Sequence, residues 1–178
     1  GVERFEADLS PQERRALQHR YGDYRRSLAQ TLPNTLRLWA FNTLWAALVY
    51  RLKDICRQLR RRRGLFDHVS EMSSRCVRRT RRYLRHQLGE SFPHQDEIWQ
   101  ELLALNWVRK KVLRDAGRIG KRDERKRAFR YIQAHPEFLY VREGRIVVRP
   151  ALLPHVVALF NSLFTNLLAG MRKGALGD

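Results

Sequence analysis

Apolar residues recur every three or four positions through most of the chain, which is the spacing of an amphipathic helix. Ser10, Pro11 and Glu13 form a strong start signal, because Ser caps a helix, Pro suits its first turn and Glu completes a capping box. Pro33 disfavours helical backbone before it, so we expect the first helix to stop there. The pattern predicts helices over residues 11–32, 34–63, 70–88 and 99–117, a short one from 128 that ends before Pro136, and a last one over 150–171.

The period of the pattern changes once, after residue 137. Residues 138–141 and 145–148 are rich in β-branched and aromatic side chains and flank Glu143-Gly144, which is typical of a tight β-hairpin. Residues 119–123 are expected to form a polar loop. We therefore predict an all-α fold, a single helical bundle of about five to six helices with one small β-hairpin before the last helix. The whole chain, 1–178, is expected to be one domain with flexible ends at 1–9 and 173–178.

The charge balance is far from that of an ordinary globular domain. Lys and Arg total 36 against 18 Asp and Glu, which gives a formal net charge of +18. A compact body with this charge attracts polyanions, so nucleic acid is the first candidate partner and an anionic membrane surface the second. The longest uninterrupted apolar run, 44–50, is far shorter than a membrane span, and the polar N-terminus does not resemble a signal peptide. We therefore expect no membrane span and a cytoplasmic location.

Arginines gather in two segments, residues 60–63 and 75–85, and acidic residues hardly interrupt them. If the two segments lie side by side in the bundle, they form a basic wall that suits a phosphate backbone. The alternative is an ordinary solvated face of charged side chains. The residues expected to bind nucleic acid are Arg60, Arg61, Arg62, Arg63, Arg75, Arg78, Arg79, Arg81, Arg82 and Arg85, together with Lys111 on the following helix.

A cationic motif stands in the helix expected over 99–117: Arg109, Lys110 and, five positions after the first, Arg114. The surrounding text reads RRTRRYL at 78–84, FP at 92–93, IW at 98–99 and NWVRKKVLRDAG at 106–117, followed by the hairpin and the last amphipathic helix. The order of these pieces over roughly residues 30–170 resembles the HEPN superfamily of helical ribonucleases and nucleotide-binding proteins.

The resemblance implies a metal-independent endoribonuclease site in a homodimer that pairs through its motif helices. In active members an Arg holds the scissile phosphate and a His, five positions later, takes the proton of the ribose 2′-hydroxyl. Arg109 matches the phosphate-binding Arg, Lys110 stands where Asn, Asp or His is usual, and Arg114 stands where the His is expected. A guanidinium stays protonated and cannot serve as a general base, so the cleft is expected to bind phosphate with its proton transfer lost or relocated.

Three hypotheses follow for the function. The first is a homodimeric protein of HEPN ancestry that binds RNA or another nucleic acid, and the resemblance places such proteins in toxin–antitoxin, phage-defence or RNA-processing systems. The second is an active ribonuclease with a different base; Arg81 and His86 also match R-x4-H, although an Arg-rich helix produces that spacing by accident. The third is an interaction subunit whose basic face docks on an acidic partner, such as an antitoxin, or on a nucleoprotein.

The remaining side chains with chemical potential are expected to be structural. Cys56 and Cys76 lack the spacing of a zinc site and are expected to be reduced, partly buried thiols, so we expect no metal and no cofactor. Histidines without a visible partner are expected to fill turn, cap or core positions: His94, His135 and His155. The tryptophans are expected to pack in the core rather than stack on bases: Trp39, Trp45, Trp99 and Trp107.

Overall fold

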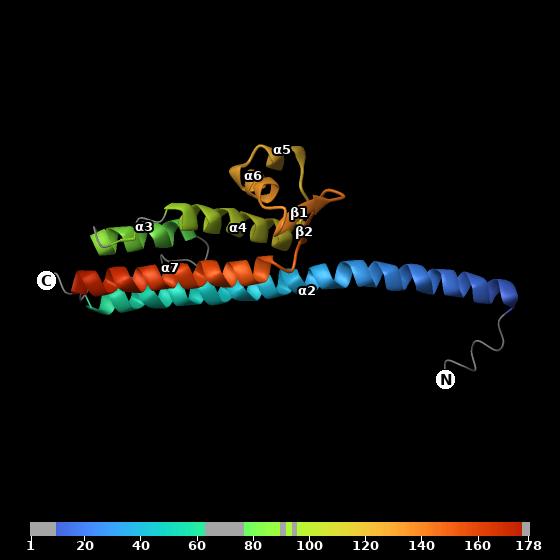
Figure 1. Cartoon of the computed structure of the whole chain (residues 1–178), viewed down its shortest axis with the longest axis horizontal. Helices are drawn as coiled ribbons and strands as arrows, with labels where there is room; N and C mark the ends of the chain where they lie inside the picture. The colour runs from blue at the N-terminus through green and yellow to red at the C-terminus, as the bar shows by residue number, and fades with distance from the viewer. Residues whose placement is uncertain (1–9, 63–76, 90–91, 94–95, 176–178) are drawn as a thin grey trace, which may run out of the picture. The chain divides into compact units, whose positions relative to one another are not determined.

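A computed structural model describes residues 10–62, 77–89, 92–93 and 96–175 (Figure 1). The internal contacts divide the chain into two compact units, Gly1–Leu36 and Arg37–Asp178. The predicted all-α class, with a hairpin directly before the last helix, is confirmed. The described residues form six helices and two strands: α2 (Pro11–Arg62), α3 (Val77–Leu88), α4 (Asp96–Asp115), α5 (Lys121–Glu124), α6 (Arg127–Ala134), β1 (Leu139–Arg142), β2 (Arg145–Val148) and α7 (Leu152–Ala175).

Helix α2 runs without a break through Pro33, so the predicted stop before that residue is wrong. A proline inside a helix removes one hydrogen bond and crowds the preceding turn, which destabilises the helix by about 3 kcal/mol. The turns on both sides keep their own hydrogen bonds, and the Thr35 hydroxyl donates to the Thr31 carbonyl at 3.0 Å across the proline. The start of α2 is as predicted, since the Ser10 N–H donates to Glu13 Oε2 at 2.9 Å and the Glu13 N–H donates to Ser10 Oγ at 3.3 Å.

The second unit has one apolar core, formed by the C-terminal part of α2 with α3, α4 and α7 (Figure 1). Trp45 of α2 packs edge-on against Phe160 of α7, with ring centroids 6.1 Å apart, and Trp99 of α4 stacks on Phe92 at 6.2 Å. The core prediction therefore holds for Trp45 and Trp99, and Trp107 is half-buried. It is wrong for Trp39, which is 75% exposed. Trp39 precedes the buried Phe41 by two residues, so the two lie about 200° apart around the helix.

The hairpin packs its buried residues on the same core and holds the end of α4. Its strands pair antiparallel from Leu139↔Val148 to Arg142↔Arg145, with Glu143 and Gly144 both at positive φ in the turn. After α4, Gly117 has φ +74 and its carbonyl accepts the Ile146 N–H at 3.0 Å, so a side chain there would be strained. The segment predicted as a polar loop over 119–123 is in part the short helix α5, which the Gly120 carbonyl and Asp123 cap.

Helix α7 is the most apolar element of the chain. Its residues Leu152–Arg172 are long and apolar enough to cross a membrane by length and composition, and 33% of the most apolar stretch is buried in the protein. Core helices of soluble proteins pass the same test, so the absence of a membrane span stays a prediction. Residues 173–175 continue α7, whereas 1–9, 176–178 and the predicted start of the third helix at 70–76 lie outside the described residues.

Candidate functional site

The apolar spacing of α4 determines which of its side chains are available for binding. Trp99, Leu102, Leu105 and Val108 recur at three-residue steps and are fully buried in the core. The residues between them point to the sides of the helix, where α4 borders α2, α3 and α6. Arg109 follows Val108 directly and is half-buried at one of these borders. The core packing therefore fixes the direction of the cationic motif.

A basic groove with a volume of about 640 Å³ lies between α2 and α4. From α4 it is lined by all three motif cations, Arg109, Lys110 and Arg114. From α2 it is lined by Lys53 and Arg57, which sequence reasoning did not single out. No Asp or Glu stands among the described residues that line it, which also include Trp45, Ala46, Val49, Tyr50, Asn106 and Leu113. Five cations from two helices thus share one groove without a lining carboxylate.

Arg109 is half-buried where it lines the groove. Its Nε atom is buried and has no hydrogen-bond partner among the described residues. Burial lowers the pKa of the Arg109 guanidinium, because desolvation disfavours the charged form. A buried donor without an acceptor costs about 1–3 kcal/mol. Lys110 and Arg114 add a like-charged i,i+4 pair on the same helix, and an anion between them would relieve their repulsion.

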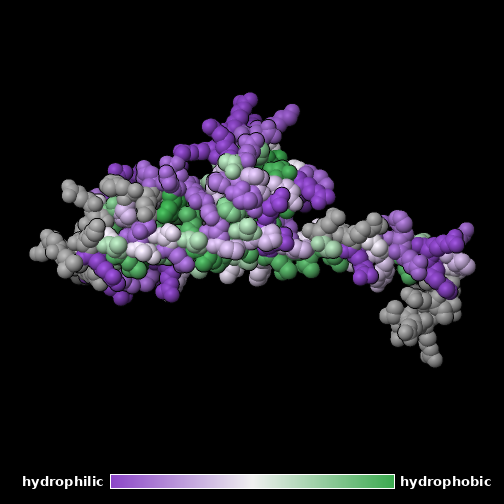
Figure 2. Space-filling view, in the orientation of Figure 1, coloured by the Kyte–Doolittle hydropathy of each residue, from purple (hydrophilic) through white to green (hydrophobic). Residues whose placement is uncertain are grey.

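A second hollow, of about 440 Å³, adjoins the basic groove on the other side of α4 and shares Asn106 and Lys110 with it. Arg78 of α3 and Arg127 of α6 line this second hollow, together with Trp107. Figure 2 shows hydrophilic side chains gathered over α5 and α6, where Arg122, Arg125, Lys126 and Arg130 are exposed. Positive charge therefore continues from the basic groove across the open face of α4.

Most, but not all, of the arginines of the predicted basic wall lie among the described residues. Arg78, Arg79, Arg82 and Arg85 are exposed on α3, and of these Arg78 borders the second hollow. Arg81 is half-buried and forms an ion pair with Asp96 at the start of α4. Arg60 and Arg61 lie in the last turn of α2. The side chain of Arg62, and Arg63 and Arg75 altogether, lie outside the described residues.

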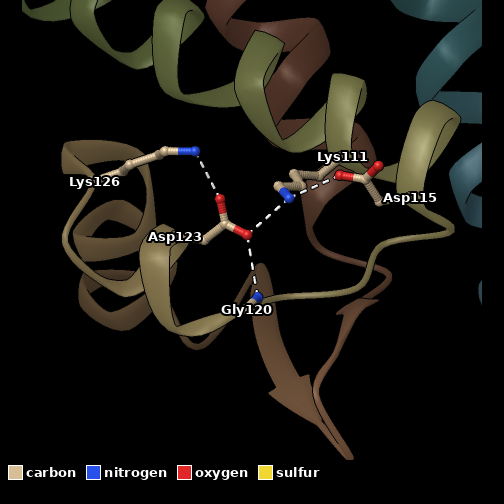
Figure 3. A network of polar contacts seen from close by, with 5 residues as sticks. All are labelled: Lys111, Asp115, Gly120, Asp123 and Lys126. Atoms are coloured by element: carbon tan, nitrogen blue, oxygen red, sulfur yellow. Dashed lines mark hydrogen bonds and ion pairs between the residues drawn. The ribbon is translucent and has the colours of Figure 1, made fainter.

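Lys111 neighbours the motif but serves a different structure, as Figure 3 shows. Its ammonium donates to Asp115 Oδ2 and to Asp123 Oδ2, both at 2.7 Å. Asp123 also accepts the Lys126 ammonium at 2.7 Å and the Gly120 N–H at 3.1 Å. These hydrogen bonds raise the pKa of Lys111 and hold the pKa of the Asp123 carboxyl far below its ordinary range. Two carboxylates thus balance the charge of Lys111, which ties the end of α4 to α5.

Asp123→Asn should lower the free energy of unfolding by about 1–3 kcal/mol near pH 7, because two ammonium groups lose their carboxylate. The native pKa of Asp123 lies below its ordinary value of 3.8. Its contribution is therefore complete above that value and is lost as the pH falls further through the native pKa. Thermal unfolding followed by circular dichroism between about pH 7 and pH 2 tests this. The exposed neighbour Glu124→Gln is the control, and equal melting temperatures for Asp123→Asn and the unsubstituted protein would contradict the role.

A second polar cluster joins α4, α6 and α7, and its residues line neither the basic groove nor the second hollow. Glu101 Oε1 accepts the Tyr131 hydroxyl at 2.6 Å and faces His155 Nε2 at 2.5 Å. Burial and the Glu101 carboxylate raise the pKa of Tyr131. His155 also stacks on Phe138, with centroids 4.2 Å apart, and His135 lies 3.2 Å from Glu137. These contacts agree with the structural roles expected for His135 and His155, and the sequence did not indicate their partners; His94 lies outside the described residues.

The described part of the chain contains no candidate metal site and no reactive thiol. Among the described residues, no group of three or more His, Cys, Asp or Glu is placed to hold a metal ion. Cys56 is buried and free, and burial raises the pKa of its thiol to about 12, so it is a poor nucleophile. Cys76 lies outside the described residues. The basic groove is therefore the strongest candidate site.

Comparison of the chain with known protein families, with curated proteins and with solved structures found no match. The fold is a helical bundle with a hairpin before its last helix, and the candidate site is a groove lined by five cationic side chains and no carboxylate among the described residues. The resemblance to the HEPN superfamily stays a prediction from the order of sequence motifs.

Proposed function

We propose that the protein binds RNA in the basic groove between α2 and α4, as a member of HEPN ribonuclease ancestry that has lost its catalytic base. The observation that carries the proposal is the convergence of the three motif cations with Lys53 and Arg57 of a second helix. Cations that are far apart in the sequence and share a groove without a carboxylate favour a polyanion over a neutral ligand. In this proposal the toxin–antitoxin or phage-defence setting is supported by the resemblance alone.

The groove suits the sugar–phosphate backbone of a single strand. Guanidinium groups bind phosphate oxygens in a bidentate manner, and Arg109 and Arg114 supply two of them from one helix. Tyr50 lines the same groove and is 62% exposed, so its ring is available to stack on an unpaired base. Stacking of this kind accepts every base, whereas direct reading of a sequence would need hydrogen-bond partners for base edges. The groove is thus suited to single-stranded RNA of varied sequence.

The same groove is poorly suited to cleavage. Cutting RNA without a metal needs a group that accepts the proton of the 2′-hydroxyl while the 2′-oxygen attacks the neighbouring phosphate and the 5′-oxygen leaves. Apart from Tyr50, the titratable side chains that line the groove are Lys53, Arg57 and the three motif cations. Ammonium and guanidinium groups are hydrogen-bond donors without a free acceptor. The groove lining therefore favours binding of the RNA phosphate but does not supply a base for the proton of the ribose 2′-hydroxyl.

Pairing of two copies across α4 belongs to the same proposal. Leu113 and Tyr50 are exposed apolar side chains at the groove, and a second copy would cover them. Two such grooves face to face would repel each other, since every lining charge is positive. A strand of RNA between them would offset the repulsion, so we expect pairing to depend on RNA and on salt concentration.

The double variant Arg114→His with Lys110→Asn tests the proposal directly. It places an imidazole in the groove that already contains Arg109, and an imidazole titrates near neutral pH. Labelled RNA is incubated with either protein in the presence of EDTA, and both binding and cleavage are measured. We expect both proteins to bind and only the variant to cut, leaving 2′,3′-cyclic phosphate ends.

Controls separate the outcomes of this experiment. Adding Arg109→Ala to the double variant should abolish its cleavage, because the phosphate is no longer held. Cleavage by the unsubstituted protein would show that the base lies elsewhere and would contradict the proposal that the protein has lost its ribonuclease activity. If neither protein binds RNA, the groove is not a nucleic-acid site and the proposal fails.

A further inference from the structure

The N-terminal unit presents one continuous apolar face on α2. Large apolar side chains follow each other there at steps of three or four residues, so they line one side of the helix. They are between 38% and 65% exposed. We define this face, the apolar stripe, as Leu17, Tyr21, Tyr24, Leu28, Leu32 and Leu36.

Within this unit, no other element among the described residues packs on the helix. Single exposed apolar residues are common on protein surfaces, but a continuous stripe marks an interaction surface. In proteins, helical stability comes mainly from packing of an apolar face rather than from intrinsic propensity. Residues 17, 21, 24 and 28 follow the four-three-four spacing with which a helix packs against a second helix. A partner helix is thus the natural cover.

The charges beside the stripe indicate which helix fits. Arg20 and Arg25 stand three or four positions from stripe residues and therefore flank it. The nearby acids have contacts of their own, since Glu13 accepts the Ser10 N–H and Asp23 lies 3.1 Å from His19 Nδ1. A second copy would bring its own arginines towards Arg20 and Arg25, whereas a helix flanked by Glu or Asp would pair with them.

We propose that the apolar stripe docks an acidic amphipathic helix of a partner protein. The partner lays its apolar residues on Tyr21, Tyr24 and Leu28 and places carboxylates beside Arg20 and Arg25. The stripe belongs to residues 11–36 and shares no residue with the basic groove. Docking of the partner and binding of RNA can therefore be tested separately, and the failure of one leaves the other standing.

Two synthetic peptides of about four heptads test the proposal. Both carry Leu at the apolar heptad positions; one has Glu and the other Lys at the flanking positions. Affinity for the full chain is measured by fluorescence anisotropy at about 150 mM salt. We expect the Glu peptide to bind one to one, at least about tenfold more tightly than the Lys peptide. Equal affinity for both peptides, or no binding of the Glu peptide, would overturn the proposal.

Variants show whether the stripe is the place of binding. Tyr24→Ser with Leu28→Ser should weaken binding of the Glu peptide at least about tenfold, and Arg20→Glu with Arg25→Glu should reverse the preference between the peptides. Arg15→Glu with Arg122→Glu removes the same charge from exposed positions off the stripe and should leave the preference unchanged. Undiminished binding by the serine variant would place the peptide elsewhere. Sedimentation that shows self-association abolished by the serine variant would make a second copy the occupant.

Discussion

Replacing Arg109 and Arg114 together by glutamate should weaken binding of single-stranded RNA by at least about a hundredfold at moderate salt. Each arginine is expected to make a charged hydrogen bond to phosphate worth about 1.5–3 kcal/mol. The substitution also places two carboxylates in a groove whose lining contains none. The remaining cations, Lys53, Arg57 and Lys110, would then be partly neutralised by the new acids. The loss should therefore exceed the effect of removing two charges at random.

Anisotropy of a labelled uridine oligonucleotide, titrated at several salt concentrations, measures this effect. Loss of two phosphate contacts should reduce the salt slope of the logarithm of the affinity by about 1.4, given about 0.7 per contact for a single strand. The control is Arg122→Glu with Arg130→Glu, which makes the same change of net charge at exposed positions outside the groove. If the control loses as much affinity as the groove variant, binding depends on the total charge of +18 rather than on the groove.

The local part of the site could be predicted from the sequence. Helical periodicity places Arg109, Lys110 and Arg114 on neighbouring sides of one helix, and the structure brings all three into one groove. Lys110 and Lys111 are neighbours in sequence but lie about 100° apart around the helix. One lines the groove and the other lies between Asp115 and Asp123. Lys111 rather than Lys110 meets a carboxylate because Asp123 lies on the side of Lys111. The position of Asp123 is set by helix α5, which the sequence pattern did not predict.

The distant part of the site could not be predicted in this way. Lys53 and Arg57 are more than fifty residues before Arg109, and only the packing of α2 on α4 brings them together. One signal was present: Ala46, Tyr50, Lys53 and Arg57 follow each other at helical steps on the side that the apolar core positions leave free. The contact of Glu101 with His155 spans 54 residues and likewise follows from packing. The rule that a helix stops before proline also overstated the effect of Pro33. The free energy that one proline costs is smaller than the stabilisation that the surrounding helical turns supply together.

Trp99→Ala should destabilise the second unit by about 3–5 kcal/mol, the typical result of deleting a large buried aromatic side chain. Trp99 is fully buried in α4 and stacks on Phe92, so its removal leaves a cavity that the helices cannot easily close. Domains are stable by only about 5–15 kcal/mol, and this one variant therefore approaches complete unfolding. Since α4 presents the basic groove, binding of RNA should be lost together with the fold.

Trp99→Phe should have a much smaller effect, and the contrast tests the packing of α4. The indole Nε1 of Trp99 is buried and has no hydrogen-bond partner among the described residues, at a cost of about 1–3 kcal/mol. Phenylalanine leaves a smaller cavity and removes this unpaired donor, so the two effects largely offset each other. Trp45 is 1% exposed and lines the basic groove, and its indole nitrogen is not among the fully buried unpaired polar atoms of the described residues. Trp45→Phe should therefore cost more than Trp99→Phe in urea unfolding, and the reverse order would show that Trp99 has a partner for its nitrogen.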